Sequence, residues 1–296
     1  MSDSQTTISQ VLLQGSQTLR CSDSAKLDCE ILLLKVLNDS EQTQHSKTSL
    51  MTWPEKQLTD KQIQQFSHYL KLRSEGMPVA YITGEQDFWT LSLSVTPATL
   101  IPRPETELLV ECALEKIPET GEQNLLDLGT GSGAIALAIA SERSKARVLA
   151  SDFSQQALSI AQKNAEQLHI TNISFCRSHW FNNIPGQQFD IIISNPPYIA
   201  EKDPLLEENV RKYEPLSALH SGEEGMDDIH KIIKNSHSYL KPDSWILFEH
   251  GYNQAEAVQS LLQQYGFSLI STVKDLNQQP RVTMAKNNCS REYEKS

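Results

Sequence analysis

Residues 124–133 read NLLDLGTGSG, and they carry the strongest indication of the fold. Residues 124–128 predict a short buried strand, because strands covered on both faces read as continuous hydrophobic runs. The glycines that follow predict a tight turn into a helix, whose apolar residues are Ile135, Leu137, Ala138 and Ile139. Such a turn lets a ligand approach the backbone closely, and the amino end of a helix offers free N–H groups to an anion.

A second strand extends this unit and ends in an acid. Residues 146–151 read ARVLAS, and Asp152 follows them, 21 residues after Gly131. An acid at this point of a βαβ unit can accept hydrogen bonds from both hydroxyls of a ribose. The order of strand, glycine turn, helix, strand and acid therefore predicts a cofactor that contains a nucleoside.

The glycine turn leaves two classes of cofactor open. Gly129-x-Gly131-x-x-Ala134 also fits the dinucleotide-binding fingerprint, so a nicotinamide cofactor is one alternative. A sulfonium cofactor would instead place its carboxylate over the glycine turn and its methyl group at the strand ends. The sequence shows no obvious acid for hydride transfer, and the turn described next suits an amine, so the sulfonium is favoured.

A second informative stretch is residues 190–198, which read DIIISNPPY. The β-branched run predicts a buried strand that stops at Asn195, because Pro196 and Pro197 have no amide hydrogen for a ladder. The Asn195 side-chain oxygen and the Pro196 carbonyl can accept both hydrogens of a planar NH2 group, and Tyr198 adds a flat amphipathic face. The alternative is a rigid turn without catalytic duty, since Asn-Pro is a common turn former.

The chain divides by composition into four parts. We expect a helical partner-binding domain over residues 1–75 and a β-hairpin linker over 76–104. A catalytic domain then occupies residues 105–287, and residues 288–296 form a tail, with fraying expected from Asn287 on.

Periodicity predicts the elements of the first two parts. The expected buried helical faces are Ile8, Val11, Leu12, Gly15 and Leu19, then Leu27, Ile31 and Leu34, then Ile63, Phe66 and Leu70. Thr59 and Gln62 resemble a capping box at the start of the last of these helices. The arms of the hairpin are expected at residues 81–84 and 88–95.

In the catalytic part, helices and strands are expected to alternate. Helices are predicted over 105–114, from the cap Ser154 to Leu168, over 226–240 and over 254–264. Further strands are predicted over 173–176, 245–249, 267–273 and 281–285. Seven strands with a closing antiparallel pair fit an α/β sheet of the methyltransferase type. Trp180 follows the strand 173–176, where it would stack on an adenine ring or fill the core.

Composition excludes several classes of protein. The chain has 296 residues and a net charge of −11, which argues against a broad nucleic-acid surface. No run of 18 apolar residues and no signal-like N-terminus is present, so no membrane association is expected. The five cysteines form no C-x-x-C pair, which indicates reduced thiols, no metal site and a cytoplasmic location.

With these residues in hand, the chain resembles the release factor glutamine methyltransferase family from about Tyr81 to Arg281. The blocks that carry the resemblance are LIPRPETE (100–107), DLGTGSG (127–133), NPPY (195–198), YEPLSAL (213–219) and EHG (249–251). The resemblance implies a class I S-adenosylmethionine-dependent methyltransferase fold, with a seven-stranded sheet and a small N-terminal helical domain joined by a β-hairpin linker. It also implies a cytoplasmic enzyme that we expect to be a monomer.

The resemblance further implies a site and a reaction. S-adenosyl-L-methionine would be held by Gly129, Thr130, Gly131, Ser132, Gly133, Asp152, Trp180 and Asn195. The substrate would be the glutamine of the Gly-Gly-Gln loop in class-1 peptide-chain release factors, bound at Asn195, Pro196, Pro197 and Tyr198. Of these, Asn195, Pro196 and Tyr198 would be catalytic in a direct methyl transfer to the amide nitrogen.

Two departures from the family pattern and two alternative functions stay open. His179 stands where relatives usually have Asp, which puts a side-chain contact to the adenine amino group in doubt. Ser94 stands where a bulkier residue is frequent, so the packing of the hairpin is in question. The alternatives are an adenine-N6 methyltransferase acting on DNA or RNA and a non-catalytic module that binds a nucleoside cofactor.

Overall fold

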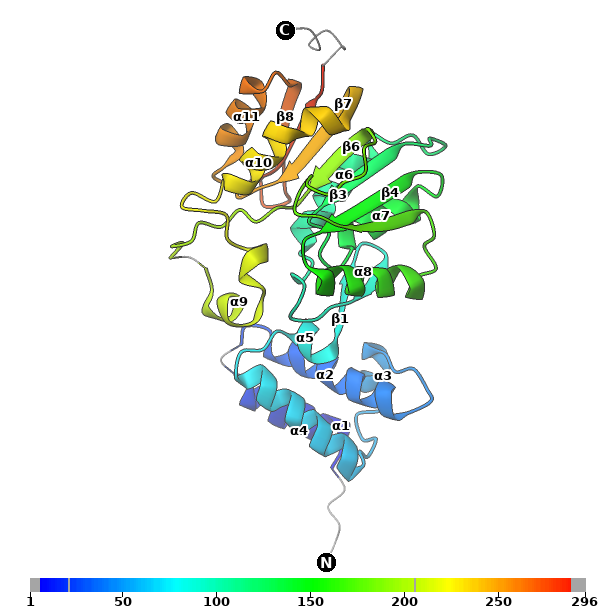
Figure 1. The fold of residues 1–296 in the computed structure, drawn as a ribbon. Helices are drawn as coiled ribbons and strands as arrows, with labels where there is room; N and C mark the ends of the chain where they lie inside the picture. The colour runs from blue at the N-terminus through cyan, green and yellow to red at the C-terminus, as the bar shows by residue number, and fades with distance from the viewer. Residues whose placement is uncertain (1–5, 21, 205, 289–296) are drawn as a thin grey trace, which may run out of the picture. The chain divides into compact units, whose positions relative to one another are not determined.

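The structure is a computed structural model that describes residues 6–20, 22–204 and 206–288. The chain forms two compact units, Met1–Gly84 and Glu85–Ser296 (Figure 1). Each unit has a hydrophobic core of its own. The predicted tail, 288–296, lies outside the described residues except for Asn288.

The N-terminal unit is helical. Its helices are α1 (Ile8–Thr18), α2 (Ala25–Ser40), α3 (Lys47–Thr52), α4 (Asp60–Ser74) and α5 (Val79–Thr83). Helices α1, α3 and α4 each begin with a capping box, in which the N-cap and N3 side chains bond each other's backbone N–H. The box of α4 joins Thr59 and Gln62, which confirms the start predicted from the sequence.

The buried face predicted for α2 is wrong at two of its three residues; only Leu34 packs, partly buried, against the core. Leu27 and Ile31 are exposed, whereas the core receives Cys29, Leu32, Leu33, Val36 and Leu37. Both sets repeat at helical spacing, so periodicity alone gives two candidate stripes on one helix. Packing against α1 and α4 selects the second stripe.

The hairpin is shifted along the chain from its predicted position. Residues 79–83 form the helix α5 rather than a strand, and Gly84 ends it in the left-handed region at φ 76°. The arms of the hairpin are β1 (Glu85–Phe88) and β2 (Leu91–Ser94). The prediction failed because the backbone N–H groups of Tyr81 and Ile82 donate locally to the Pro78 carbonyl, as in a helix.

The described residues of the second unit contain a seven-stranded sheet of order β5-β4-β3-β6-β7-β9-β8, which confirms the predicted architecture. Its strands are β3 (Asn124–Leu128), β4 (Arg147–Asp152), β5 (Ile173–Arg177), β6 (Phe189–Ser194), β7 (Leu240–Glu249), β8 (Ser268–Lys274) and β9 (Pro280–Lys286). Strands β3 to β7 run parallel, and β9 lies antiparallel between β7 and β8.

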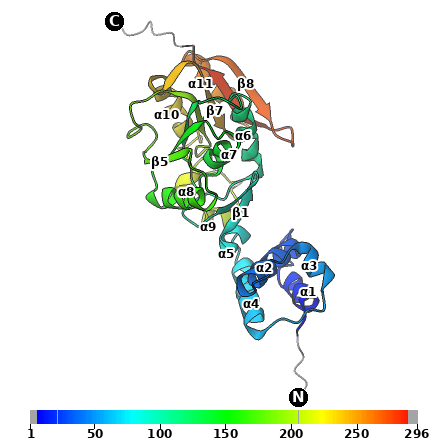
Figure 2. The same ribbon diagram turned by 90° about the vertical axis from the view of Figure 1, so that its right-hand side faces the viewer.

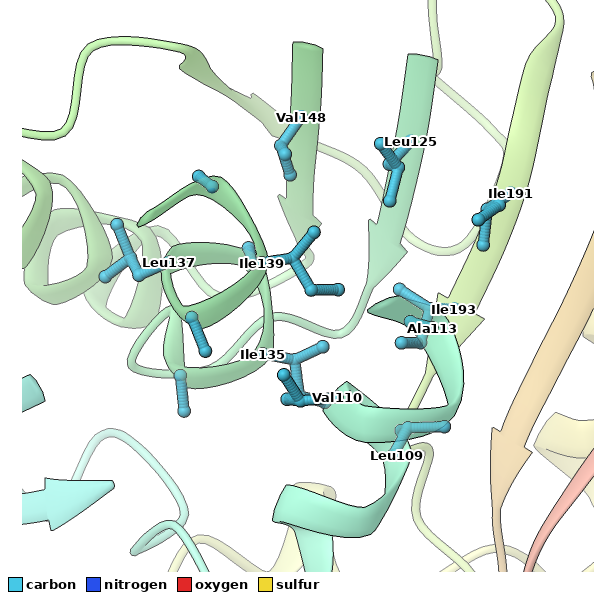
Figure 3. Close-up of a cluster of buried hydrophobic side chains, with 14 of the residues drawn as sticks. Leu109, Val110, Ala113, Leu125, Ile135, Leu137, Ile139, Val148, Ile191 and Ile193 are labelled. Carbon is cyan, nitrogen blue, oxygen red and sulfur yellow. The ribbon is translucent and has the colours of Figure 1, made fainter. Parts of the chain in front are cut away.

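Helices cover both faces of this sheet (Figure 2). One face carries α6 (Glu107–Leu114), α7 (Ala134–Glu142) and α8 (Gln155–Gln167), and the other carries α10 (Asp227–Ser236) and α11 (Ala255–Gln264). Figure 3 shows Ile135 and Ile139 of α7 lying against Leu125, Val148 and Ile191 of the sheet. Helix α8 begins at Ser154, whose hydroxyl accepts from the Ala157 N–H, as predicted.

Short elements and chain ends correct two further predictions. The helix expected to reach Leu240 ends at Ser236, because η3 (His237–Tyr239) follows and Leu240 already belongs to β7. Asn287, expected in a frayed tail, is fully buried, and its backbone N–H donates to the Ser244 carbonyl. The remaining short helices are η1 (Pro104–Thr106), α9 (Glu208–Tyr213) and η2 (Leu216–Ala218).

Two observations complete the fold. The described part of the chain contains no helix with the length and apolar character needed to cross a membrane. Ser94 joins the hairpin to α8, because its N–H donates to Asn164 Oδ1 and its hydroxyl to Gln167 Oε1.

Two leucines test how far stability depends on the hydrophobic core around α7. Leu137 of α7 is fully buried, so Leu137→Ala should lower the free energy of unfolding by about 2–5 kcal/mol. Leu276, in the turn between β8 and β9, is fully exposed, and Leu276→Ala makes the same chemical change without leaving a cavity. Urea unfolding followed by tryptophan fluorescence measures both; equal losses in the two variants would contradict the assigned packing.

Candidate active site

The register of the parallel strands brings four chemically informative residues into one row. Leu128 of β3 pairs with Ser151 of β4 and with Ser194 of β6, and Ser194 pairs with Phe248 of β7. The next residue on each strand therefore lies at the carboxyl edge of the sheet. Across β4, β3, β6 and β7 these residues are Asp152, Gly129, Asn195 and Glu249.

The glycine turn after β3 is a backbone surface without side chains. Gly129, Gly131 and Gly133 have φ angles of 78°, 58° and 88°, which favour glycine. A Cβ on Gly131 would meet no atom within 4 Å, so the backbone there faces open space. Helix α7 follows its N-cap Gly133 without a side-chain cap. The Ala136 N–H bonds the Asp127 carboxyl, which leaves the N–H groups of Ala134 and Ile135 for an anion.

Asp152 is held rigidly beside that turn. Its Oδ2 accepts from the Gly131 N–H at 2.9 Å, and its Oδ1 accepts from the Ser154 N–H at 2.8 Å. Burial raises the pKa of this carboxyl, and the backbone donors oppose the shift. Each oxygen keeps a second lone pair for a hydroxyl of a ligand.

These parts line one cleft of about 800 Å³. Its wall includes Gly129, Gly131, Asp152, Trp180, Asn195 and Pro197 from the predicted site. Segments 97–100 and 215–218 contribute further wall, and Lys231 and His220 add basic groups. Asn195 thus opens into the same cavity as the glycine turn.

Trp180 and His179 lie at the end of the cleft beyond Asp152. Trp180 is half-buried with φ 50°, and its indole N–H donates to Asp228 Oδ1 at 3.1 Å. Asp228 also accepts from the Ser221 hydroxyl and from Lys231, so the indole ring is fixed in place. His179 is exposed and lines the cleft.

The four residues of the NPPY turn have different surroundings. Asn195 is half-buried, and its Nδ2 donates to Thr106 Oγ1 at 3.2 Å. Pro196 is buried, and Pro197 lines the cleft. The Tyr198 hydroxyl turns away from the cleft wall and donates to Glu249 Oε1 at 3.3 Å. Burial raises the pKa of Tyr198, and the neighbouring Glu249 raises it further.

Three residues of the predicted cofactor set lie behind the cleft surface rather than on it. The Thr130 hydroxyl donates to the fully buried Asp127 at 2.6 Å. Ser132 is buried, and its carbonyl accepts from Asn164. Gly133 packs against α8, because a Cβ there would lie 3.2 Å from that of Ala161. These residues shape the turn from within.

Several residues that the structure places at the site have no role in the sequence-based prediction. Thr106 and Glu249 lie next to the NPPY turn, and Asp228 holds Trp180. The buried Glu214 forms an ion pair with Arg103, and it also accepts from the Ile101 N–H. All of these residues except Asp228 stand in the sequence blocks quoted for the resemblance, but their contacts join segments far apart in the chain.

This geometry defines a class I methyltransferase fold with its cleft at the carboxyl edge of the sheet. The family model "Methyltransferase small domain" matches residues 104–211, and "PrmC N-terminal domain" matches residues 10–84. A solved 16S rRNA methyltransferase of T. thermophilus shares the fold, with a TM-score of 0.52 and 18% identity over 69% of this chain and 50% of that chain.

Curated relatives narrow the class to one family. The release factor glutamine methyltransferase of Escherichia coli (strain K12) is 44% identical over 93% of this chain and 97% of its own length. That of Salmonella typhimurium (strain LT2) is 46% identical over 92% of this chain and 96% of its own length. The chain belongs to the release factor glutamine methyltransferase family.

Asp127 generates a prediction about pH. Burial raises the pKa of its carboxyl from 3.8 to about 7. Well below pH 4 the group is protonated in both the folded and the unfolded chain. As the pH rises the unfolded chain ionises first, so the contribution of Asp127 to stability falls until about pH 7. Asp127→Asn should abolish this fall, which amounts to a few kcal/mol between pH 4 and 7.

Urea unfolding of wild type and variant at several pH values measures the difference. Asp243→Asn, at a side chain that is 78% exposed, is the control and should leave the pH dependence unchanged. Parallel curves for wild type and Asp127→Asn would contradict the assigned burial.

Proposed function

We propose that this protein transfers a methyl group from S-adenosyl-L-methionine to the side-chain amide nitrogen of a glutamine in a release factor. The target is the glutamine of the Gly-Gly-Gln motif in class-1 peptide-chain release factors. The observation that carries the proposal is the single cleft that joins Asn195 to Gly129, Gly131 and Asp152 in a chain of this family.

The residues of the cleft suit this cofactor. Gly131 lets the cofactor approach the backbone closely, while its own N–H donates to Asp152. The first N–H groups of α7 suit a carboxylate, and Asp152 keeps acceptor capacity for a ribose hydroxyl. The fixed indole of Trp180 offers a flat face to an adenine ring. When bound, S-adenosyl-L-methionine supplies an electrophilic methyl group on a positively charged sulfur.

The NPPY turn suits a substrate that presents a planar NH2 group. Asn195 Oδ1 and the Pro196 carbonyl accept the two hydrogens of the substrate NH2 group, which aims the nitrogen lone pair into the cleft. Residues 195–198 contain no Asp, Glu or His, so the turn acts by position rather than as a general base. Well-aligned reactants can gain on the order of 7–11 kcal/mol, more than any single hydrogen bond supplies.

We assign the remaining roles as part of the same proposal. The N-terminal helical unit recognises the release factor, and the protein acts as a monomer without a stable nucleic-acid complex. Its helices carry exposed apolar side chains for such a contact, among them Leu13, Met51 and Trp53.

Transfer of labelled methyl tests the function against its alternatives. The protein is incubated with methyl-labelled S-adenosyl-L-methionine and one of three acceptors: a class-1 release factor, the same factor with the motif glutamine changed to alanine, or adenine-containing DNA or RNA. We expect label in the intact release factor alone. Label in nucleic acid would instead support an adenine methyltransferase, and cofactor binding without any transfer would support a non-catalytic module.

The first variant is Asn195→Ala. Because it removes an acceptor from the substrate amide, kcat for release factor methylation should fall by about a hundredfold or more. Cofactor affinity, measured by isothermal titration, should fall only modestly. Near-normal methylation by this variant would refute the role of Asn195.

The second variant is Asp152→Ala, which acts on the other end of the cleft. Loss of the two hydroxyl acceptors should raise the cofactor Kd by at least about tenfold, the effect of about 1.4 kcal/mol. At saturating cofactor, turnover should recover more than it does in Asn195→Ala. An unchanged Kd in isothermal titration would remove Asp152 from the cofactor site.

A further inference from the structure

The Asn195 side chain has two ends of nearly the same shape and opposite hydrogen-bonding character. Its oxygen accepts, its NH2 group donates, and a half-turn about χ2 exchanges them. Only the oxygen can receive a hydrogen from a substrate NH2 group. The protein therefore needs a contact that holds the NH2 end of Asn195 away from the substrate.

Thr106 supplies that contact. Asn195 Nδ2 donates to Thr106 Oγ1 at 3.2 Å, and the described residues contain no recorded hydrogen bond to Asn195 Oδ1. Thr106 is 4% exposed and ends η1, next to the start of α6. A threonine hydroxyl can accept or donate, however, so Thr106 fixes the amide only if its own proton points elsewhere.

Glu249 offers an acceptor for that proton. It is 1% exposed at the end of β7, next to Asn195 in the row at the sheet edge. Burial raises its pKa, and the Thr106 hydroxyl opposes the shift more than any other group, ahead of Arg281 and Tyr198. Its Oε2 has no direct hydrogen bond within the described part of the chain, while Oε1 accepts from Tyr198. A carboxyl oxygen without a proton only accepts, and Oε2 is the oxygen left for the Thr106 hydroxyl.

We infer that Thr106 and Glu249 are positioning residues that fix which end of the Asn195 amide faces the substrate. Glu249 accepts the Thr106 proton, Thr106 accepts from Asn195 Nδ2, and Asn195 Oδ1 is left to accept from the substrate nitrogen. The inference rests on the proposed function for its kinetic consequence and on the structure alone for the hydrogen bonds.

A matched pair of variants at Thr106 tests the inference. Thr106→Val keeps the shape and removes the hydroxyl, and Thr106→Ser keeps the hydroxyl and removes the methyl group. In Thr106→Val we expect kcat to fall about tenfold, the size of one lost hydrogen bond, with the KM for release factor and the cofactor Kd within about twofold. Thr106→Ser should restore kcat. Wild-type kcat in Thr106→Val, or an equal loss in both variants, would overturn the inference.

Glu249→Gln tests the second link through a double-mutant cycle with Thr106→Val. If Glu249 acts through Thr106, its effect on kcat should shrink in the Thr106→Val background, since coupled residues are not additive. Full additivity of the two changes would remove Glu249 from the relay.

A spectroscopic readout separates this inference from the proposed function. In protein labelled with ¹⁵N-asparagine, the Asn195 side-chain NH2 signal is identified by its loss in Asn195→Asp. Slow hydrogen exchange of that group in wild type and Thr106→Ser, with fast exchange in Thr106→Val, supports the relay whether or not methyl transfer occurs. Equal exchange in all three would overturn it, whereas a wild type that methylates no release factor counts against the proposed function alone.

Discussion

The parallel register of β4, β3, β6 and β7 is the constraint on which the site depends. It aligns Asp152, Gly129, Asn195 and Glu249 as one row, although the first and last are almost a hundred residues apart in the chain. A slip of one residue in any pair would send the side chains of that strand to the opposite face of the sheet. The strands that set this register are buried on both faces by the cores around α7 and α10, which makes such a slip costly.

The same burial places carboxyl groups in a poor environment for charge. The pKa values of Asp127, Asp152 and Glu249 are all raised by burial. Each carboxyl accepts from neighbouring hydrogen-bond donors. Asp127 accepts from the Thr130 hydroxyl, Asp152 from two backbone N–H groups, and Glu249 from the Tyr198 hydroxyl. Donors of this kind hold a carboxylate in one orientation, and orientation is what the row at the sheet edge has to provide.

The sequence was sufficient wherever the signal was local. The strand 124–128 has the predicted bounds, and the cap at Ser154 is correct, because both depend on neighbouring residues alone. The sequence was insufficient where contacts with distant segments determine the secondary structure or the buried face. Tyr81 and Ile82 have the composition of a strand but lie in a helix, and α2 buries a different stripe from the predicted one. Thr106 was part of a quoted block, yet only the folded chain shows that it accepts from Asn195, 89 residues further on.

The NPPY turn by itself does not distinguish an amide from an aromatic amine. Asn195 and Pro196 offer two acceptors, and any planar NH2 group with two hydrogens satisfies them equally well. Under the proposed function, discrimination therefore depends on surfaces outside the turn. The cleft walls beside it include segments 97–100 and 215–218. Glu214 joins those walls, because it binds Arg103 and the Ile101 N–H on one side and precedes Pro215 on the other. In the proposed function the turn holds the substrate nitrogen, and the buried Glu214 ties together the two wall segments beside it.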